Sequence, residues 1–222
     1  MATSKGNLFG HLHGKIGSMY GRSVNGKNLI ASMPTRNPDR VPTLAERQRR
    51  ESFSALSSLA SDFSDVIQIG LKNYRSKNRL AAPRNAFMHI NSDIYTFDNL
   101  GHLVFLFKRL AFSRGRMPMP VLDAITPGRP NDYDITVELK EVFDEPGCSL
   151  EDEFIVVAYC IDANQHLIQT CTREFPKVTF YNIPVSWKAT NINFYAFALG
   201  KGTINKKESS DTAYLGEIRF EP

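Results

Sequence analysis

Residues 133–140 read YDITVELK, a stretch in which apolar and polar side chains alternate without a break. A period of two is typical of a strand with one buried face and one solvated face. Residues 154–161, FIVVAYCI, are apolar on both faces. Further strand-like runs, separated by Gly, Pro and Asn turn signals, occupy residues 103–107, 167–172, 178–183, 192–199 and 213–220. Strands at this spacing, with no helical pattern between them, predict an antiparallel immunoglobulin-like β-sandwich over residues 100–222.

The segment before these strands, residues 43–99, has a helical pattern. Thr43 and Glu46 fit a capping box at a helix N-terminus. One apolar stripe, at spacings of three and four, runs through Phe53, Leu56, Leu59, Ala60, Phe63, Ile67 and Leu71. We therefore expect a long helix from Leu44 to about Tyr74, which Gly70 ends or bends. A second, short helix is expected from Ala82 to Asn91, with Pro83 at its first position.

Residues 1–42 contain a glycine-punctuated β segment followed by a proline-rich linker. Asn25-Gly26 lies between two strand-like runs, and this dipeptide favours the type I′ turn of a hairpin. Three prolines in residues 34–42 exclude a helix interior and a central strand there. A lone hairpin is marginal in water, so it needs another surface to pack on. The complete chain is therefore predicted to be an α+β protein with an N-terminal β-hairpin arm, a long helix and a sandwich.

Positive charge is concentrated at the start of the chain. Residues 1–50 carry nine Lys and Arg against two Asp and Glu, which gives a net charge of +7, whereas residues 101–222 carry a net charge of −3. The residues proposed to contact a partner are Lys15, Arg22, Lys27, Arg36, Arg40, Arg47, Arg49 and Arg50. Cations on an extended arm neutralise phosphates without reading bases, and they suit an acidic protein surface equally well. A solvated basic terminus is the simpler interpretation of the same pattern.

The motifs of common catalytic sites are missing from the sequence. It contains no GxxxxGK[ST], GxGxxG, HExxH or GxSxG pattern, and its three cysteines have no CxxC spacing. The acidic residues of the stretch 144–153 fall in predicted turns, where carboxylates are normally solvated. We therefore expect no enzyme activity, no cofactor and no metal. The three lone cysteines and the absence of a signal-peptide pattern in residues 1–10 favour cytoplasmic synthesis.

Two sets of short motifs carry a resemblance to a known family. The N-terminal set has the form G-K-x-G, a strand, G-K, a strand, N-P-x-T and Q-x-x-R-x-x-F, and it is matched here by Gly14-Lys15-Ile16-Gly17, Tyr20-Gly21-Arg22, Asn25-Gly26-Lys27, Ile30, Pro34, Arg36-Asn37-Pro38, Thr43, Arg50 and Phe53. The C-terminal set comprises residues 185–187, 194–198 and 214–217. The chain thus resembles an uncharacterised family widespread in Bacteroidota, and small proteins encoded among tailed-phage structural genes. Two departures are the inserted Val41-Pro42 and the presence of Arg47 where the pattern has Gln.

The resemblance implies a structural, virion-associated role and names no catalytic residue. We therefore expect a non-enzymatic assembly protein whose basic arm contacts other subunits, by self-association or within a larger assembly. A nucleic-acid-associated protein that uses the same arm is the first alternative. A ligand-binding or carbohydrate-binding sandwich that uses Tyr133, Tyr159 or Tyr195 is the second, although tyrosines in strands mostly pack against their neighbours. No membrane contact is expected, because the most apolar stretch, residues 100–112, is interrupted by His102, Lys108 and Arg109.

Overall fold

The structure, a computed structural model, divides into two compact units, residues 1–43 and residues 44–222. Each unit is described by itself. The residues that the structure describes are 13–24, 27–33, 40–76, 79–128, 133–140, 148–201 and 208–221.

The first unit contains a three-stranded antiparallel sheet in the order β1-β2-β3. Its strands are β1 (Gly14–Ile16), β2 (Met19–Val24) and β3 (Lys27–Ser32). β2 and β3 pair from Met19 opposite Ser32 to Val24 opposite Lys27, around the turn expected at residues 25 and 26, which lie outside the described residues. Gly17 lies in the turn from β1 to β2 with φ +56°, a conformation that costs glycine little because it has no Cβ. β1 was not among the expected strands.

The second unit contains two antiparallel sheets that face each other. The strands are β8 (Leu122–Pro127), β9 (Ile135–Leu139), β10 (Glu153–Cys160), β11 (Gln165–Thr172), β12 (Lys177–Phe180), β13 (Asn191–Leu199) and β14 (Ala213–Arg219). One sheet has the order β11-β10-β13-β14 and the other has the order β12-β9-β8. The seven strands are arranged as in a constant immunoglobulin domain, with one difference. The fourth strand along the chain, β11, pairs with the third, β10, and so belongs to the larger sheet.

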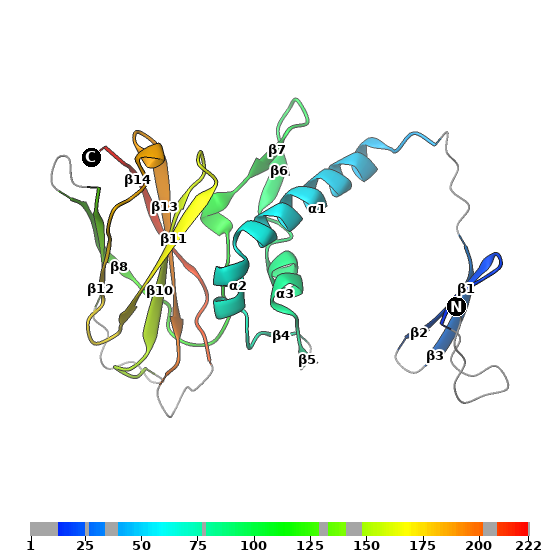
Figure 1. Cartoon of the computed structure of the whole chain (residues 1–222), viewed down its shortest axis with the longest axis horizontal. Helices are drawn as coiled ribbons and strands as arrows, with labels where there is room; N and C mark the ends of the chain where they lie inside the picture. The colour runs from blue at the N-terminus through cyan, green and yellow to red at the C-terminus, as the bar shows by residue number, and fades with distance from the viewer. Residues whose placement is uncertain are drawn as a thin grey trace. The chain divides into compact units, whose positions relative to one another are not determined.

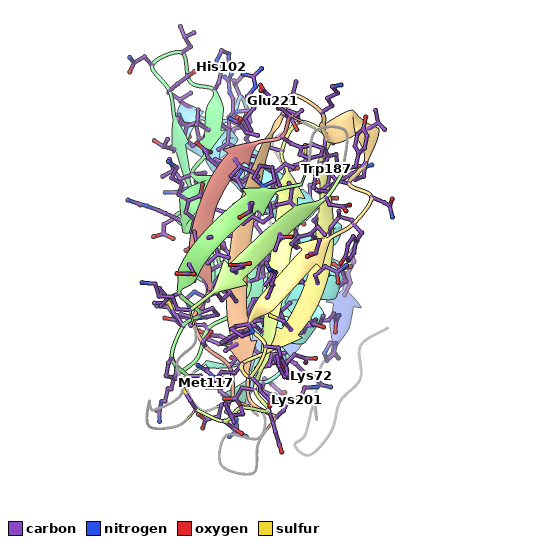
Figure 2. All side chains as sticks on the ribbon, turned by 90° about the vertical axis from the view of Figure 1, so that its left-hand side faces the viewer. Lys72, His102, Met117, Trp187, Lys201 and Glu221 are labelled. Atoms are coloured by element: carbon purple, nitrogen blue, oxygen red, sulfur yellow. The ribbon has the colours of Figure 1, made fainter. Side chains whose placement is uncertain are left out.

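The sandwich core lies between the two sheets. Ile135, Val137 and Leu139 of β9 are buried, whereas the intervening Thr136 and Glu138 are half-buried, as the alternation in residues 133–140 predicts. They pack in one cluster with Phe154 of β10 and with Trp187, which is fully buried. Figure 2 shows Trp187 and Glu221 near one end of the sandwich, and Met117 and Lys201 near the other.

The central strands β10 and β13 are buried on both faces. Ile155, Val157, Tyr159, Tyr195 and Phe197 point away from the sandwich core and belong to a second core. This second core is closed by the helices α1 (Leu44–Asp62), α2 (Ser64–Gly70) and α3 (Pro83–Ile90), which lie beside the four-stranded sheet in Figure 1. The expected division between residues 99 and 100 therefore falls inside one unit, because the helices and the sheet share a core.

The single helix expected from Leu44 to Tyr74 is wrong in one respect: α1 and α2 are separate helices that meet at Phe63. Phe63 leaves the helical conformation and is fully buried, with its ring 4.7 Å from that of Phe112 and 4.8 Å from that of Tyr159. Every residue of the predicted apolar stripe is buried except Phe53, whose side chain is 67% exposed. α2 ends at Gly70, where a Cβ would overlap the carbonyl oxygen of Phe112. α3 begins at Pro83, as predicted.

Two short hairpins and two short helical turns complete the described structure. The hairpins are β4 (Arg75–Ser76) with β5 (Arg79–Leu80), and β6 (Tyr95–Phe97) with β7 (Leu103–Phe105). The 3₁₀ turns are η1 (Phe107–Arg109) and η2 (Val185–Trp187). The sandwich strand expected at residues 103–107 is therefore wrong: β7 pairs with β6 outside the sandwich sheets, and the chain turns at η1 directly afterwards.

Candidate interaction surface

The sheet of the first unit exposes apolar side chains on both faces. Tyr20 lies opposite Lys15 and Ala31, and Arg22 lies opposite Leu29, so these five side chains share one face. The opposite face carries Met19 and Ile30, which are 49% and 57% exposed. No described hydrophobic side chain of this unit is buried. A three-stranded sheet normally needs one packed hydrophobic face. The described side chains of this sheet provide no such face.

The proposed basic residues divide between the two units. Lys15 and Arg22 lie on the face that carries Tyr20, at diagonal positions across β1 and β2. The remaining described ones lie at the start of the second unit or just before it: Arg40 in the preceding segment, and Arg47, Arg49 and Arg50 as exposed residues of α1. Lys27 begins β3, but its side chain, like all of Arg36, lies outside the described residues. The structure thus brings together Lys15 and Arg22 on one face.

A groove of about 400 Å³ lies between α1 and α3 in the second unit. Phe53, Leu56, Met88 and Tyr95 form its apolar lining, and Arg49 lies at its edge. The exposed ring of Phe53, which the helical stripe placed in the core, belongs to this groove. This groove is an exposed apolar surface in addition to the sheet β1-β2-β3.

A polar cluster that was not expected from the sequence joins α2 to the β10–β11 hairpin. The Nε2 atom of His166 lies 3.0 Å from both carboxylate oxygens of Asp65. Partial burial tends to raise the pKa of Asp65, but hydrogen bonds from His166 and from the Val66 amide outweigh it, so this pKa lies below its usual value. The pair therefore ties the helical layer to the sheet.

Asn164 extends this cluster from the hairpin turn. It adopts φ +47°, which Asn tolerates better than most residues, and its Oδ1 accepts a hydrogen bond from the Tyr159 hydroxyl at 3.0 Å. Its Nδ2 donates to Asp62 at 3.2 Å. Burial, with a smaller contribution from the charge of Asp62, raises the pKa of Tyr159 to about 12. An Asn in a predicted turn was the available signal in the sequence, but its partner Asp62 lies 102 positions away.

The tyrosines considered for ligand binding are mainly packing residues. Tyr159 is 3% exposed and Tyr195 is fully buried, with its hydroxyl donating to the carbonyl oxygen of Phe107 at 2.9 Å. Burial raises the pKa of Tyr195 far above its usual value. Tyr133 is half-buried and its ring lies 6.1 Å from that of Phe220. Tyr159 and Tyr195 therefore offer no exposed aromatic platform.

The acidic stretch differs from the expectation of solvated carboxylates. Asp152 is fully buried beside Arg173, with 3.7 Å between its Oδ2 and the Arg173 Nε. The carboxylate also accepts hydrogen bonds from the amides of Ser149 and Lys201, and the Arg173 guanidinium lies 4.8 Å from the centre of the Phe154 ring. This ion pair anchors the turn before β10. Residues 144 and 145 lie outside the described part of the chain.

Neither a metal site nor a membrane-spanning helix is found within the described ranges. These ranges contain no group of three or more His, Cys, Asp or Glu side chains that could hold a metal ion. Cys160 and Cys171 form no disulfide within the described ranges, and burial raises the pKa of Cys171 to about 11. None of the described helices combines the length and apolar character needed to cross a membrane.

Comparisons with known proteins return little. No family model matches the chain, and no curated protein matches it. Among solved structures, the chain is similar to the fn3 domain of human collagen alpha-1(XX) chain, with 14% sequence identity and a TM-score of 0.35. That similarity covers 49% of this chain and 89% of the collagen domain. A likeness at this level carries no argument about function.

Proposed function

We propose that this chain is a non-enzymatic assembly protein, and that the sheet β1-β2-β3 docks on a second copy of the chain. The observation that carries the proposal is the sheet that exposes Met19, Tyr20, Leu29 and Ile30 and has no described buried hydrophobic side chain. Covering these side chains removes apolar surface from water, which is the main driving force of association. The resemblance to small proteins encoded among tailed-phage structural genes implies the same role.

Two features of the sheet support docking on a protein surface. β3 pairs only with β2 among the described strands, so its outer edge can add to the sheet of a neighbour through backbone hydrogen bonds. Lys15 and Arg22 give one face a positive charge, which complements the net negative charge of residues 101–222. Apolar contact then supplies affinity, and the two cations favour an acidic partner surface.

The test is the mass of the particle in solution, measured by size-exclusion chromatography with light scattering. We expect the wild-type chain to exceed the 25.0 kDa of one copy, and the double variant Met19→Ser with Ile30→Ser to return to one copy. The matched control is Leu100→Ser, which removes an 81%-exposed apolar side chain from the second unit and should leave the mass unchanged. A wild-type chain that stays monomeric at high concentration, or a control that dissociates as well, overturns the proposal.

A single-stranded nucleic acid is the second candidate partner. The observation that favours it is Tyr20 between Lys15 and Arg22 on one face, because bases stack on aromatic rings while cations neutralise phosphates. Fluorescence anisotropy with a labelled single-stranded DNA should then show binding that weakens steeply with salt and that is lost in Lys15→Ala with Arg22→Ala. The control is Lys188→Ala, an exposed cation of the second unit. Equal binding by both variants, or no binding at low salt, rules this partner out.

A further inference from the structure

A pocket of about 410 Å³ lies in the second unit on the face of the four-stranded sheet opposite the sandwich core. Half-buried apolar side chains line it, namely Phe105 at the end of β7, Leu106 and Phe107 just after it, and Ile161 just after β10. Asn193 of β13 forms its buried end. The volume is in the range of small-molecule sites. The pocket lies in a different unit from the sheet β1-β2-β3.

Asn193 is the feature that points to a ligand. Its side chain is 2% exposed and faces the pocket, and its Oδ1 accepts a hydrogen bond from the Tyr214 hydroxyl at 3.1 Å. Its Nδ2 has no hydrogen-bond partner. A buried donor without an acceptor destabilises the fold, so each such group needs an explanation. A ligand atom that accepts a hydrogen bond would satisfy the Asn193 amide.

The apolar wall is held in place before any ligand arrives. The rings of Phe105 and Phe107 lie 5.6 Å apart, and the Phe107 ring lies 5.7 Å from that of Tyr159. The carbonyl oxygen of Phe107 accepts a hydrogen bond from the buried Tyr195 hydroxyl. The amide of Leu106 donates to the carbonyl oxygen of Ile94 at 2.6 Å. A wall fixed in this way favours a flat apolar group, because little conformational freedom is lost on binding.

The mouth of the pocket is charged. Lys108 and Arg109 are exposed there, and neither takes part in a salt bridge among the described residues. Glu217, which lies opposite Asn193 across β13 and β14, contributes one carboxylate. Two cations against one carboxylate leave a net positive charge. The mouth therefore favours the anionic end of a ligand.

We propose that this pocket binds a small aromatic acid, with a carbonyl oxygen on Asn193 Nδ2, the ring against Phe105 and Phe107, and the carboxylate at Lys108 and Arg109. The probe that combines these three groups is 4-acetylbenzoate. The matched probe 4-ethylbenzoate lacks only the carbonyl oxygen, and acetophenone lacks only the carboxylate. The hydrogen bond and the charge contact can therefore each be removed by changing the ligand or by changing the protein.

The experiment is titration of the full chain with each probe, followed by amide chemical shifts in ¹H–¹⁵N NMR spectra. We expect 4-acetylbenzoate to shift the amides of residues 105–109 and 193, and to bind roughly tenfold more tightly than either matched probe, since one hydrogen bond or charge contact is worth about that factor. Lys108→Ala with Arg109→Ala should weaken 4-acetylbenzoate but not acetophenone. Glu217→Gln should strengthen 4-acetylbenzoate.

Asn193→Leu keeps the side-chain size and removes the unpaired donor, so 4-acetylbenzoate should bind no better to it than 4-ethylbenzoate does. If this variant does not fold, the surface variants Lys108→Ala with Arg109→Ala and Glu217→Gln still decide, because their side chains are exposed. The proposal is overturned if 4-ethylbenzoate binds the wild-type chain as tightly as 4-acetylbenzoate. It is also overturned if neither probe shifts residues 105–109.

Discussion

The Nε2 atom of His166 lies 3.0 Å from both oxygens of the Asp65 carboxylate, although the two residues are 101 positions apart in the sequence. This contact connects α2, on the helical layer, with β11, an edge strand of the sandwich. We expect the contribution of this long-range interaction to stability to be lost at acid pH.

Asp65→Asn tests that dependence. The folded state lowers the pKa of Asp65 below its ordinary value of 3.8, so the stabilisation by the pair is complete above that value and is lost as pH falls through the lower folded pKa. Urea denaturation should therefore show wild type more stable than Asp65→Asn at neutral pH, with a difference that shrinks below about pH 4. His166→Gln should behave in the same way. A difference that stays constant across this range contradicts the assignment.

Gly70→Ala should destabilise the second unit. The new Cβ would overlap the carbonyl oxygen of Phe112, a backbone atom that has no flexible side chain to move aside. We expect a loss of roughly 2–3 kcal/mol in the free energy of unfolding, as is usual for overpacking in a core. Gly101→Ala is the comparison, because its Cβ meets nothing within 4 Å and its cost of about 1 kcal/mol comes from φ +85° alone. Equal losses would contradict the close approach at Gly70.

Asp152→Ala should be strongly destabilising, since it leaves the Arg173 guanidinium buried without its carboxylate. Removing one partner of a buried pair typically costs about 3–5 kcal/mol, whereas replacing both with apolar residues costs much less. The double variant Asp152→Ala with Arg173→Met should therefore be more stable than Asp152→Ala alone. A double-mutant cycle by urea denaturation measures this coupling. Additive losses would mean that the two side chains act independently.

Tyr195→Phe isolates one hydrogen bond of the second core. The ring is fully buried, so phenylalanine preserves its packing and removes the bond to the Phe107 carbonyl oxygen. We expect a loss of about 1 kcal/mol in the free energy of unfolding. Tyr181→Phe, at a 66%-exposed position, is the control and should leave stability unchanged. A neutral Tyr195→Phe would show that water or another donor replaces the hydroxyl.

Some of the fold could be predicted from the sequence because local patterns report it directly. Strong periodicity found β9, and continuous apolar runs found β10 and β13. β8 was missed because its half-exposed residues and terminal Pro127 give no alternation. The break at Phe63 left no trace in the sequence, since Phe63 fits the helical stripe and only its burial against Phe112 explains it.

The candidate sites depend on residues that pairing and packing bring together. The positive charge of Lys15 and Arg22 is evident from the sequence, but their common face follows from the strand register. Asn193 could not be singled out, because its unpaired Nδ2 becomes visible only when the segment after β7 covers β13. The chemistry of a side chain can be read from the sequence, whereas the hydrogen-bond partner of a buried polar atom depends on how distant segments pack.

The burial of β10 and β13 on both faces has a practical consequence for truncated expression. A fragment that starts at residue 100 would keep every strand of the sandwich sheets yet uncover Ile155, Val157, Tyr159, Tyr195 and Phe197 on one side of the larger sheet. Such an apolar sheet surface aggregates readily. Shortened clones should therefore retain α1, α2 and α3 to yield soluble material.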